Sequence, residues 1–284
     1  MNFEVTAMND ILDIIRSTPD IISAEPVDTP EEYAGKCRVY SICYKSDDCR
    51  VMGYITLPQD MTAPLPCLIF NRGGNRDFGF LRPGALCRFA ERGYVCLGSQ
   101  YRGNQGGTGR EDFGGRDVDD VIKLIDIGLA LPFTIKDGVY MAGHSRGGMM
   151  TYRACSIDSR IKAAAVGAGL ADCFIMYETR EQSMKDVFHE LVGGGPEEKR
   201  QEFIERSATY WPEKIIPPML ICQGTDDWRV VPEQSIKLYK ALTAAGKECR
   251  LIKYVGADHS LAGTTYISDV CRWFDEHPLS KKGQ

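Results

Sequence analysis

From residue 65 onward, short apolar runs alternate with longer amphipathic segments. Apolar runs of four to eight residues are typical of strands that are buried on both faces, whereas the segments between them have the length of helices. Strands that alternate with helices require right-handed crossovers and form a mainly parallel sheet. We expect strands at residues 65–70, 94–98, 139–143, 161–166, 219–223 and 250–255, and helices at 83–92, 117–130, 147–155, 233–245 and 266–276. The sequence therefore predicts an α/β fold.

Two segments do not follow this alternation. Residues 1–60 contain a short helix and two alternating runs, at 38–44 and 50–57, that predict an antiparallel hairpin. Residues 171–216 are rich in charged, helical stretches and lack a strand pattern, so we expect a helical cap inserted over one end of the sheet. We interpret the chain, residues 1–284, as one domain with a cap.

The composition excludes several classes of protein. The chain is 43% hydrophobic and 26% charged, with a formal net charge of −5, which does not suggest a nucleic-acid partner or binding to an anionic membrane. No apolar run approaches the roughly 18 residues of a membrane span, and Met1–Asp10 lacks the pattern of a secretory signal. The eleven cysteines include no C-x-x-C pair, so we expect reduced core residues of a cytoplasmic protein instead of disulfides or a zinc site.

A candidate nucleophile lies at Ser145. Residues 143–147, Gly-His-Ser-Arg-Gly, match the pattern G-x-S-x-G between an apolar strand and the small-residue start of a helix. This is the setting of a nucleophile elbow, in which glycines permit a sharp turn and the serine backbone is strained. The N–H of Arg146 then lies at a helix N-terminus, where it can stabilise an oxyanion. The alternative is a glycine-rich turn in an inactive α/β protein.

A candidate base and acid follow the last two predicted strands. His259 lies in the loop after the final strand, whereas backbone alternation is expected to turn His144 away from the pocket. The alternative for His259 is a surface loop histidine. Asp226 and Asp227 both follow the penultimate strand, and both satisfy the chain order serine, aspartate, histidine. Adjacent side chains point in different directions, so only one of them can reach the imidazole.

These residues resemble the catalytic domain of prolyl oligopeptidase-type serine peptidases and, more broadly, dienelactone-hydrolase-type α/β hydrolases. The resemblance extends from about residue 65 to residue 274. The matching segments are Tyr101-Arg102-Gly103-Asn104, residues 143–148, Gly194 and Pro196 with Glu205-Arg206-Ser207, and the segment 224–232. It implies an α/β-hydrolase fold, a mainly parallel sheet flanked by helices. It also implies that a Ser-His-Asp triad acts through an acyl-enzyme.

The resemblance also assigns residues near the acid. In the family the acid stands three residues before a valine, as Asp227 stands before Val230, which favours Asp227 over Asp226. In prolyl members an arginine in this segment binds a substrate carbonyl and the valine lines the proline pocket, and Arg229 and Val230 match those places. From the residues alone, Phe174 and Tyr177 of the cap are either pocket-lining or core residues.

The chain departs from the family in two respects. Large members carry an N-terminal propeller, for which the about 60 residues before the first core strand leave no room, and this weakens the case for peptidase specificity. Several members place a tyrosine hydroxyl after that strand as an oxyanion donor, where this chain has Arg72. We therefore expect a backbone N–H of Arg72 or Gly73 to be the second donor. The alternative for the Gly73-Gly74 pair is a simple tight turn.

The prediction is a serine hydrolase with Ser145 as nucleophile, His259 as base and Asp227 as the orienting acid. The resemblance implies a peptidase that acts on short peptides or aminoacyl amides. The alternatives are a carboxylesterase that acts on small acyl or aryl esters and a catalytically silent hydrolase fold that serves as a binding protein. We expect no metal or organic cofactor, a small-molecule or short-peptide substrate, and a homodimer.

Overall fold

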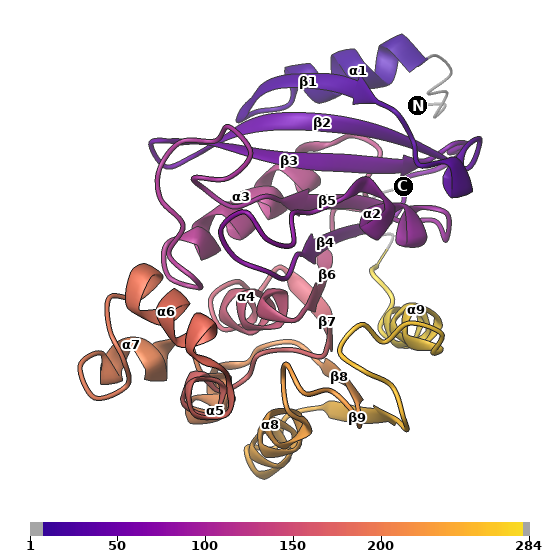
Figure 1. The fold of residues 1–284 in the computed structure, drawn as a ribbon. Coiled ribbons are helices and arrows are strands. Elements are labelled where there is room, and N and C mark those ends of the chain that lie inside the picture. Colours follow the sequence, from indigo (N-terminus) through magenta and orange to yellow (C-terminus); the bar gives the residue numbers. More distant parts are fainter. Residues whose placement is uncertain (1–7, 281–284) are drawn as a thin grey trace.

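The computed structural model describes residues 8–280, and its centre is one sheet in the strand order β1-β2-β3-β5-β4-β6-β7-β8-β9 (Figure 1). From β5 to β9 in this order, neighbouring strands pair parallel. These strands are β4 (Cys67–Asn71), β5 (Val95–Ser99), β6 (Val139–His144), β7 (Ile161–Gly167), β8 (Met219–Gly224) and β9 (Cys249–Tyr254). The predicted mainly parallel sheet is confirmed.

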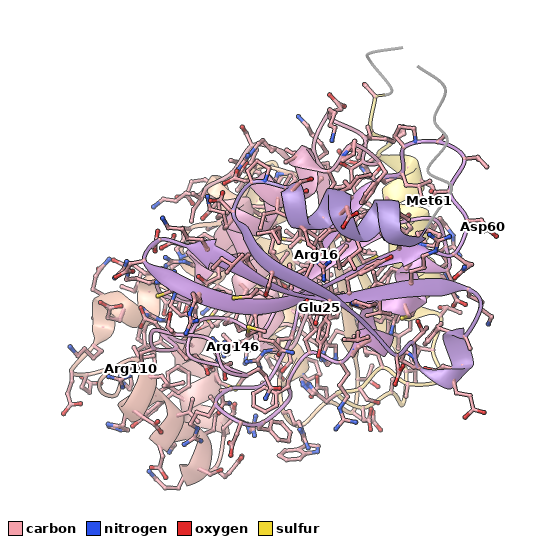
Figure 2. The ribbon with its side chains drawn as sticks, turned by 90° about the horizontal axis from the view of Figure 1, so that it is seen from above. Arg16, Glu25, Asp60, Met61, Arg110 and Arg146 are labelled. Carbon is pink, nitrogen blue, oxygen red and sulfur yellow. The ribbon has the colours of Figure 1, made fainter. Side chains whose placement is uncertain are left out.

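An antiparallel extension adds three strands beside β5. They are β1 (Ile21–Val27), β2 (Cys37–Ser46) and β3 (Cys49–Pro58), of which β3 pairs with β5. Helix α1 (Met8–Ser17) lies across β1, where Arg16 pairs with Glu25 at 3.0 Å (Figure 2). A short 3₁₀ turn, Glu31–Tyr33, joins β1 to β2.

Helices cover both faces of the sheet, because its central strands are apolar on both sides. One face carries α1, α3 (Asp117–Ala130), α4 (Arg146–Cys155) and α8 (Pro232–Ala244), whose buried side chains share one hydrophobic cluster. The other face carries α2 (Pro83–Ala90) and α9 (Tyr266–Glu276), which share a second cluster. All residues of β4, β5 and β8 are buried.

The segment between β7 and β8 contains short helices and lies beside α4 (Figure 1). Its elements are α5 (Cys173–Thr179), α6 (Gln182–Leu191), α7 (Arg200–Glu205) and the 3₁₀ turns Ala208–Tyr210 and Pro212–Lys214. Buried Asp172 caps α5 by accepting the N–H groups of Phe174 and Ile175, and it pairs with Lys237 of α8 at 2.6 Å. These contacts fix the segment against the sheet.

Within residues 8–280, no helix combines the length and apolar character that crossing a bilayer requires.

Candidate active site

Ser145 stands at a sharp turn between β6 and α4, with φ 58° and ψ −126°. A non-glycine residue reaches this strained backbone only where its surroundings impose it. A Cβ at Gly143 would lie 2.1 Å from the Gly147 carbonyl oxygen, and a Cβ at Gly147 would lie 2.0 Å from that of Asn71. The Ser145 N–H donates to the Gly167 carbonyl at 3.0 Å. Glycine is therefore required on both sides of the serine.

The imidazole of His259 is hydrogen-bonded to the carboxylate of Asp227. The distances from Nδ1 to Oδ2 and Oδ1 are 2.9 and 3.1 Å. Asp227 is buried, and Oδ1 accepts the N–H groups of Arg229 and Val230, while Oδ2 accepts Nε2 of Gln223. An ionised carboxylate can only accept, so Nδ1 of the ring carries the hydrogen and Nε2 faces outward as an acceptor. This is the tautomer that a general base needs.

Asp226 takes no part in this contact. Its carboxylate accepts the hydroxyl of Thr225 at 2.8 Å and is exposed to solvent. Of the two adjacent aspartates, the structure brings Asp227 to the imidazole.

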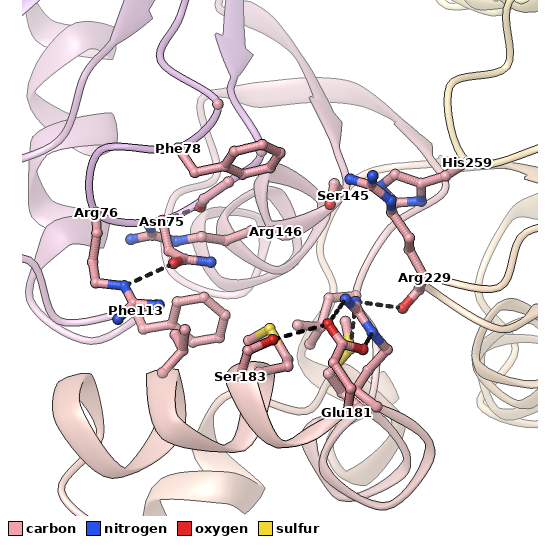
Figure 3. Close-up of a pocket in the computed structure, with 18 of the residues that line it drawn as sticks. Asn75, Arg76, Phe78, Phe113, Ser145, Arg146, Glu181, Ser183, Arg229 and His259 are labelled. Atoms are coloured by element: carbon pink, nitrogen blue, oxygen red, sulfur yellow. Dashed lines mark hydrogen bonds and ion pairs between the residues drawn. The ribbon is translucent and has the colours of Figure 1, made fainter.

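Ser145 and His259 line the same cavity, which has a volume of about 520 Å³ (Figure 3). The two labelled side chains lie next to each other in this view. Among the described residues, the Ser145 hydroxyl makes no hydrogen bond with the His259 ring. Hydrogen bonds of this kind are often long without substrate and tighten when it binds.

Two backbone N–H groups beside Ser145 are free to bind an oxyanion. Neither Gly73 nor Arg146 donates its N–H to another backbone group within the described part of the chain. Gly73 lies against Ser145, because a Cβ there would be 2.9 Å from Cβ of Ser145 and 3.4 Å from its Oγ. Gly73 and Arg146 line the cavity.

Arg72 does not line this cavity. Its buried guanidinium donates to the carbonyl groups of Gln100, Gly73 and Gly79, and its own carbonyl accepts the hydroxyl of Tyr101. Burial lowers the pKa of Arg72 to about 10, with a further contribution from the nearby Arg146 charge. Arg72 thus fixes residues 72–79 from outside the cavity, and of the two expected donors it is Gly73 that lines the cavity.

His144 was expected to turn away from the pocket, but it lines the cavity, because the loop that carries His259 folds against its ring. Its Nε2 lies 2.8 Å from the carbonyl oxygen of His259, to which it donates, and the two ring centroids are 5.0 Å apart. Burial, together with the neighbouring His259 ring, lowers the pKa of His144 to about 4. The ring therefore stays neutral at physiological pH and holds the loop of His259 beside the elbow.

The cavity wall combines apolar side chains with arginines. The apolar members come from the loops and from the segment between β7 and β8: Phe78, Phe113, Leu170, Met176, Met184 and Val187. Arg229 extends toward Ser145 and His259 from below (Figure 3). The exposed ring of Trp228 contacts the guanidinium groups of Arg180 and Arg229, each at 5.3 Å from the ring centroid.

Three of the expected substrate-binding residues lie outside this lining. Val230 is buried in the hydrophobic cluster of α5 and α6. Phe174 packs on Phe203 at a centroid distance of 5.3 Å, and the Tyr177 hydroxyl bonds the His189 ring. All three side chains pack in one hydrophobic cluster. For Phe174 and Tyr177 this agrees with the predicted alternative that they are core residues. Arg229 is the expected substrate-binding residue that reaches the cavity.

Within residues 8–280, no group of three or more His, Cys, Asp or Glu side chains is arranged to hold a metal ion.

Substitution Gly73→Ala should lower kcat at least about 10²-fold, because the new methyl group would displace Ser145 or the loop that supplies the second donor. The control is Gly84→Ala in α2, where the nearest heavy atom to an added Cβ is 3.7 Å away. Hydrolysis of a short-chain nitrophenyl ester and thermal unfolding should be measured for both variants. A Gly73→Ala enzyme with the kcat of the wild type would contradict this close approach.

The lowered pKa of His144 predicts a pH-dependent stability. An unfolded histidine titrates near pH 6.5, so between about pH 6.5 and pH 4 the unfolded chain binds a proton that the folded chain excludes. This contribution to stability is present above that window and is lost as the pH falls through it. His144→Gln keeps an N–H donor for His259 but removes the titration. Its free energy of unfolding in urea should fall less between pH 7 and pH 5 than that of the wild type; equal decreases would contradict the lowered pKa of His144.

Comparisons with known proteins identify the family of this chain. Residues 85–278 match the model of the prolyl oligopeptidase family. The uncharacterized peptidase YtmA of Bacillus subtilis is 32% identical over 206 residues, which cover 72% of this chain and 79% of the relative.

Solved structures share the fold. An acylaminoacyl peptidase in complex with Z-Gly-Gly-Phe-chloromethyl ketone has a TM-score of 0.72 at 21% identity and covers 88% of this chain, which spans only 43% of that protein. An acetyl xylan esterase from Paenibacillus sp. R4 has a TM-score of 0.70 at 16% identity, covering 95% and 93% of the two chains. The chain therefore has the predicted α/β-hydrolase fold and is a hydrolase that belongs to the prolyl oligopeptidase family of serine peptidases.

Proposed function

We propose that this enzyme is a serine peptidase for short peptides or aminoacyl amides, with Ser145, His259 and Asp227 as its catalytic triad. One observation carries the proposal: a histidine held by a buried carboxylate shares a cavity with a serine in strained backbone. Strain of this kind persists at functional sites and is not needed in an ordinary turn.

In the proposed reaction, the hydroxyl oxygen of Ser145 attacks the carbonyl carbon of the substrate while Nε2 of His259 takes its proton. Asp227 keeps the ring in the required tautomer and stabilises the imidazolium. The N–H groups of Gly73 and Arg146 donate to the oxyanion, a contribution usually worth several kcal/mol. The leaving group takes the proton from His259, and water then attacks the acyl-enzyme by the same route in reverse.

The walls of the cavity suggest which part of the substrate they hold. The apolar side chains of Met176, Met184 and Val187 suit an apolar acyl or side-chain group. Arg229, by family resemblance, would bind a substrate carbonyl, and its guanidinium extends toward Ser145 (Figure 3). We propose that the segment 171–216 acts as a cap, because α5 and α6 supply these apolar residues.

A carboxylesterase on small acyl or aryl esters is the second candidate. It is supported by the likeness to an acetyl xylan esterase, which this chain matches over 93% of that protein's length. The triad chemistry is the same for esters and amides, but an amine leaving group must be protonated as it departs. A catalytically silent hydrolase fold would need neither the strained backbone at Ser145 nor the hydrogen bond that orients the His259 imidazole.

We also propose a cytoplasmic setting for the enzyme. All eleven cysteines are free thiols and most of them are buried, as in proteins of a reducing compartment. A homodimer stays a prediction that light scattering would test.

The acid assignment predicts different effects for two adjacent substitutions. Asp227→Asn should lower kcat about 10⁴-fold, because the amide favours the wrong tautomer of His259. Asp226→Asn is the matched control and should change kcat by less than about threefold, since its exposed carboxylate binds Thr225 and takes no part in the contact with His259. The nitrophenyl ester assay measures both. A larger loss in Asp226→Asn would reverse the assignment.

A substrate panel separates the candidate functions. Purified enzyme should be assayed with aminoacyl anilides and dipeptide anilides against short-chain nitrophenyl esters, with Ser145→Ala as the blank. A peptidase should hydrolyse at least one anilide with a kcat/KM of about 10⁴ M⁻¹s⁻¹ or more, the lower end for enzymes acting on their own substrates. Turnover confined to esters would establish the esterase instead, and no turnover with any member would support the silent fold.

A further inference from the structure

The guanidinium of Arg146, the residue after the proposed nucleophile, is buried beneath the cavity. The residue is 3% exposed, and its guanidinium carbon lies 4.7 Å from the ring centroid of Tyr101 and 4.9 Å from that of Phe113. It pairs with the carboxylates of Glu111 and Asp117. Glu111 lies in the loop between β5 and α3, and Asp117 is the first residue of α3. The ion cluster therefore joins this loop and α3 to the start of α4.

This ion cluster also binds the oxyanion loop, residues 72–79, at two points. Nη1 of Arg146 donates to the carbonyl oxygen of Gly74 at 3.1 Å. Oε2 of Glu111 accepts the N–H of Arg76 at 2.9 Å. Figure 3 shows the Arg146 side chain extending from beside Ser145 toward this loop and away from His259. The two partners of the Arg146–Glu111 ion pair therefore bind a carbonyl group and an N–H group of the same loop.

Stability alone does not account for a charged cluster at this place. Burying an ion pair costs desolvation that its Coulomb attraction barely offsets, and well-packed apolar side chains are often as stable or more so. The desolvation cost is greater here because a second buried cation lies nearby. The guanidinium carbon of Arg72 is 4.9 Å from the centroid of the same Tyr101 ring. What apolar side chains cannot supply is directional hydrogen bonds to the loop.

We propose that the Arg146 side chain, clamped by Glu111 and Asp117, is a positioning residue for the oxyanion hole. Its own backbone N–H is one donor, and its guanidinium holds the Gly74 carbonyl, next to the Gly73 N–H that is the other donor. The side chain thereby sets the separation and direction of the two donors. The inference rests on the proposed serine hydrolase mechanism.

Two variants test this role. Arg146→Lys keeps the charge, but a single ammonium group cannot reach both acids and the Gly74 carbonyl in the planar geometry of a guanidinium. Glu111→Gln keeps the shape and weakens the clamp without touching the nucleophile turn, so it carries the test if the lysine variant does not fold. The control is Arg153→Lys on the same helix, whose guanidinium binds the Glu205 carbonyl outside the cavity.

The readout compares a transition-state analogue with a ground-state analogue of similar shape. Ser145 adds to 2-phenylethylboronic acid to form a tetrahedral anion whose oxygen occupies the oxyanion hole, whereas 3-phenylpropanamide binds without adding. In both variants, kcat for a nitrophenyl ester and the affinity for the boronic acid should fall together by about 10- to 100-fold, part of the effect of losing a whole donor. KM, the affinity for the amide and the Arg153→Lys control should stay within about threefold of the wild type.

The kinetic and binding results distinguish a positioning role of Arg146 from a purely structural role and from a collapsed cavity. Folded variants that keep wild-type kcat would overturn the positioning role, as would a lowered kcat with unchanged boronic acid affinity. A parallel loss of boronic acid and amide affinity would indicate a collapsed cavity and would also overturn it. Failure of the wild-type enzyme to bind the boronic acid, or activity that survives Ser145→Ala, would instead overturn the serine hydrolase mechanism itself.

Discussion

The site depends on the close approach of two backbones, the end of β4 and the first turn of α4. At their contact, any side chain on Gly147 would overlap the carbonyl of Asn71. This approach forces the chain through a tight turn at Ser145, which leaves its φ positive. It also brings Gly73, two residues past Asn71, against the serine side chain. A single steric constraint therefore places the proposed nucleophile beside both proposed oxyanion donors.

The residues on either side of Ser145 extend this arrangement in opposite directions. His144 bonds the backbone of His259, and Arg146 bonds the backbone of the oxyanion loop. The base and the oxyanion donors come from β9, β4 and α4, which are distant in sequence. His144 contacts the loop of the proposed base, and Arg146 contacts the loop of a proposed oxyanion donor. A shift of the turn at Ser145 would therefore move the whole site together. Rigid support of this kind is what preorganised catalysis requires.

Much of this arrangement could be predicted from the sequence. Short apolar runs and the amphipathic segments between them identified the parallel strands and the main helices to within about two residues. The loops after β8 and β9 indicated His259 and either Asp226 or Asp227, between which the family resemblance favoured Asp227. Strand β1 was missed because it contains Pro26 and most of its residues are exposed, so its sequence lacks the alternation of a half-buried strand. The direction of His144 was predicted wrongly, and its contacts and those of the Arg146 side chain were missed, because the sequence pattern does not show which distant loops fold against these residues. One of these contacts is the ion pair of Arg146 with Asp117 at the start of α3.

Covalent labelling with a fluorophosphonate, followed by peptide mapping, tests whether Ser145 is a nucleophile activated by His259. We expect one adduct per chain, on Ser145, formed at least about 10³-fold more slowly in His259→Ala because the hydroxyl then lacks its base. An adduct on another residue, or an unchanged labelling rate without the imidazole, would contradict these roles.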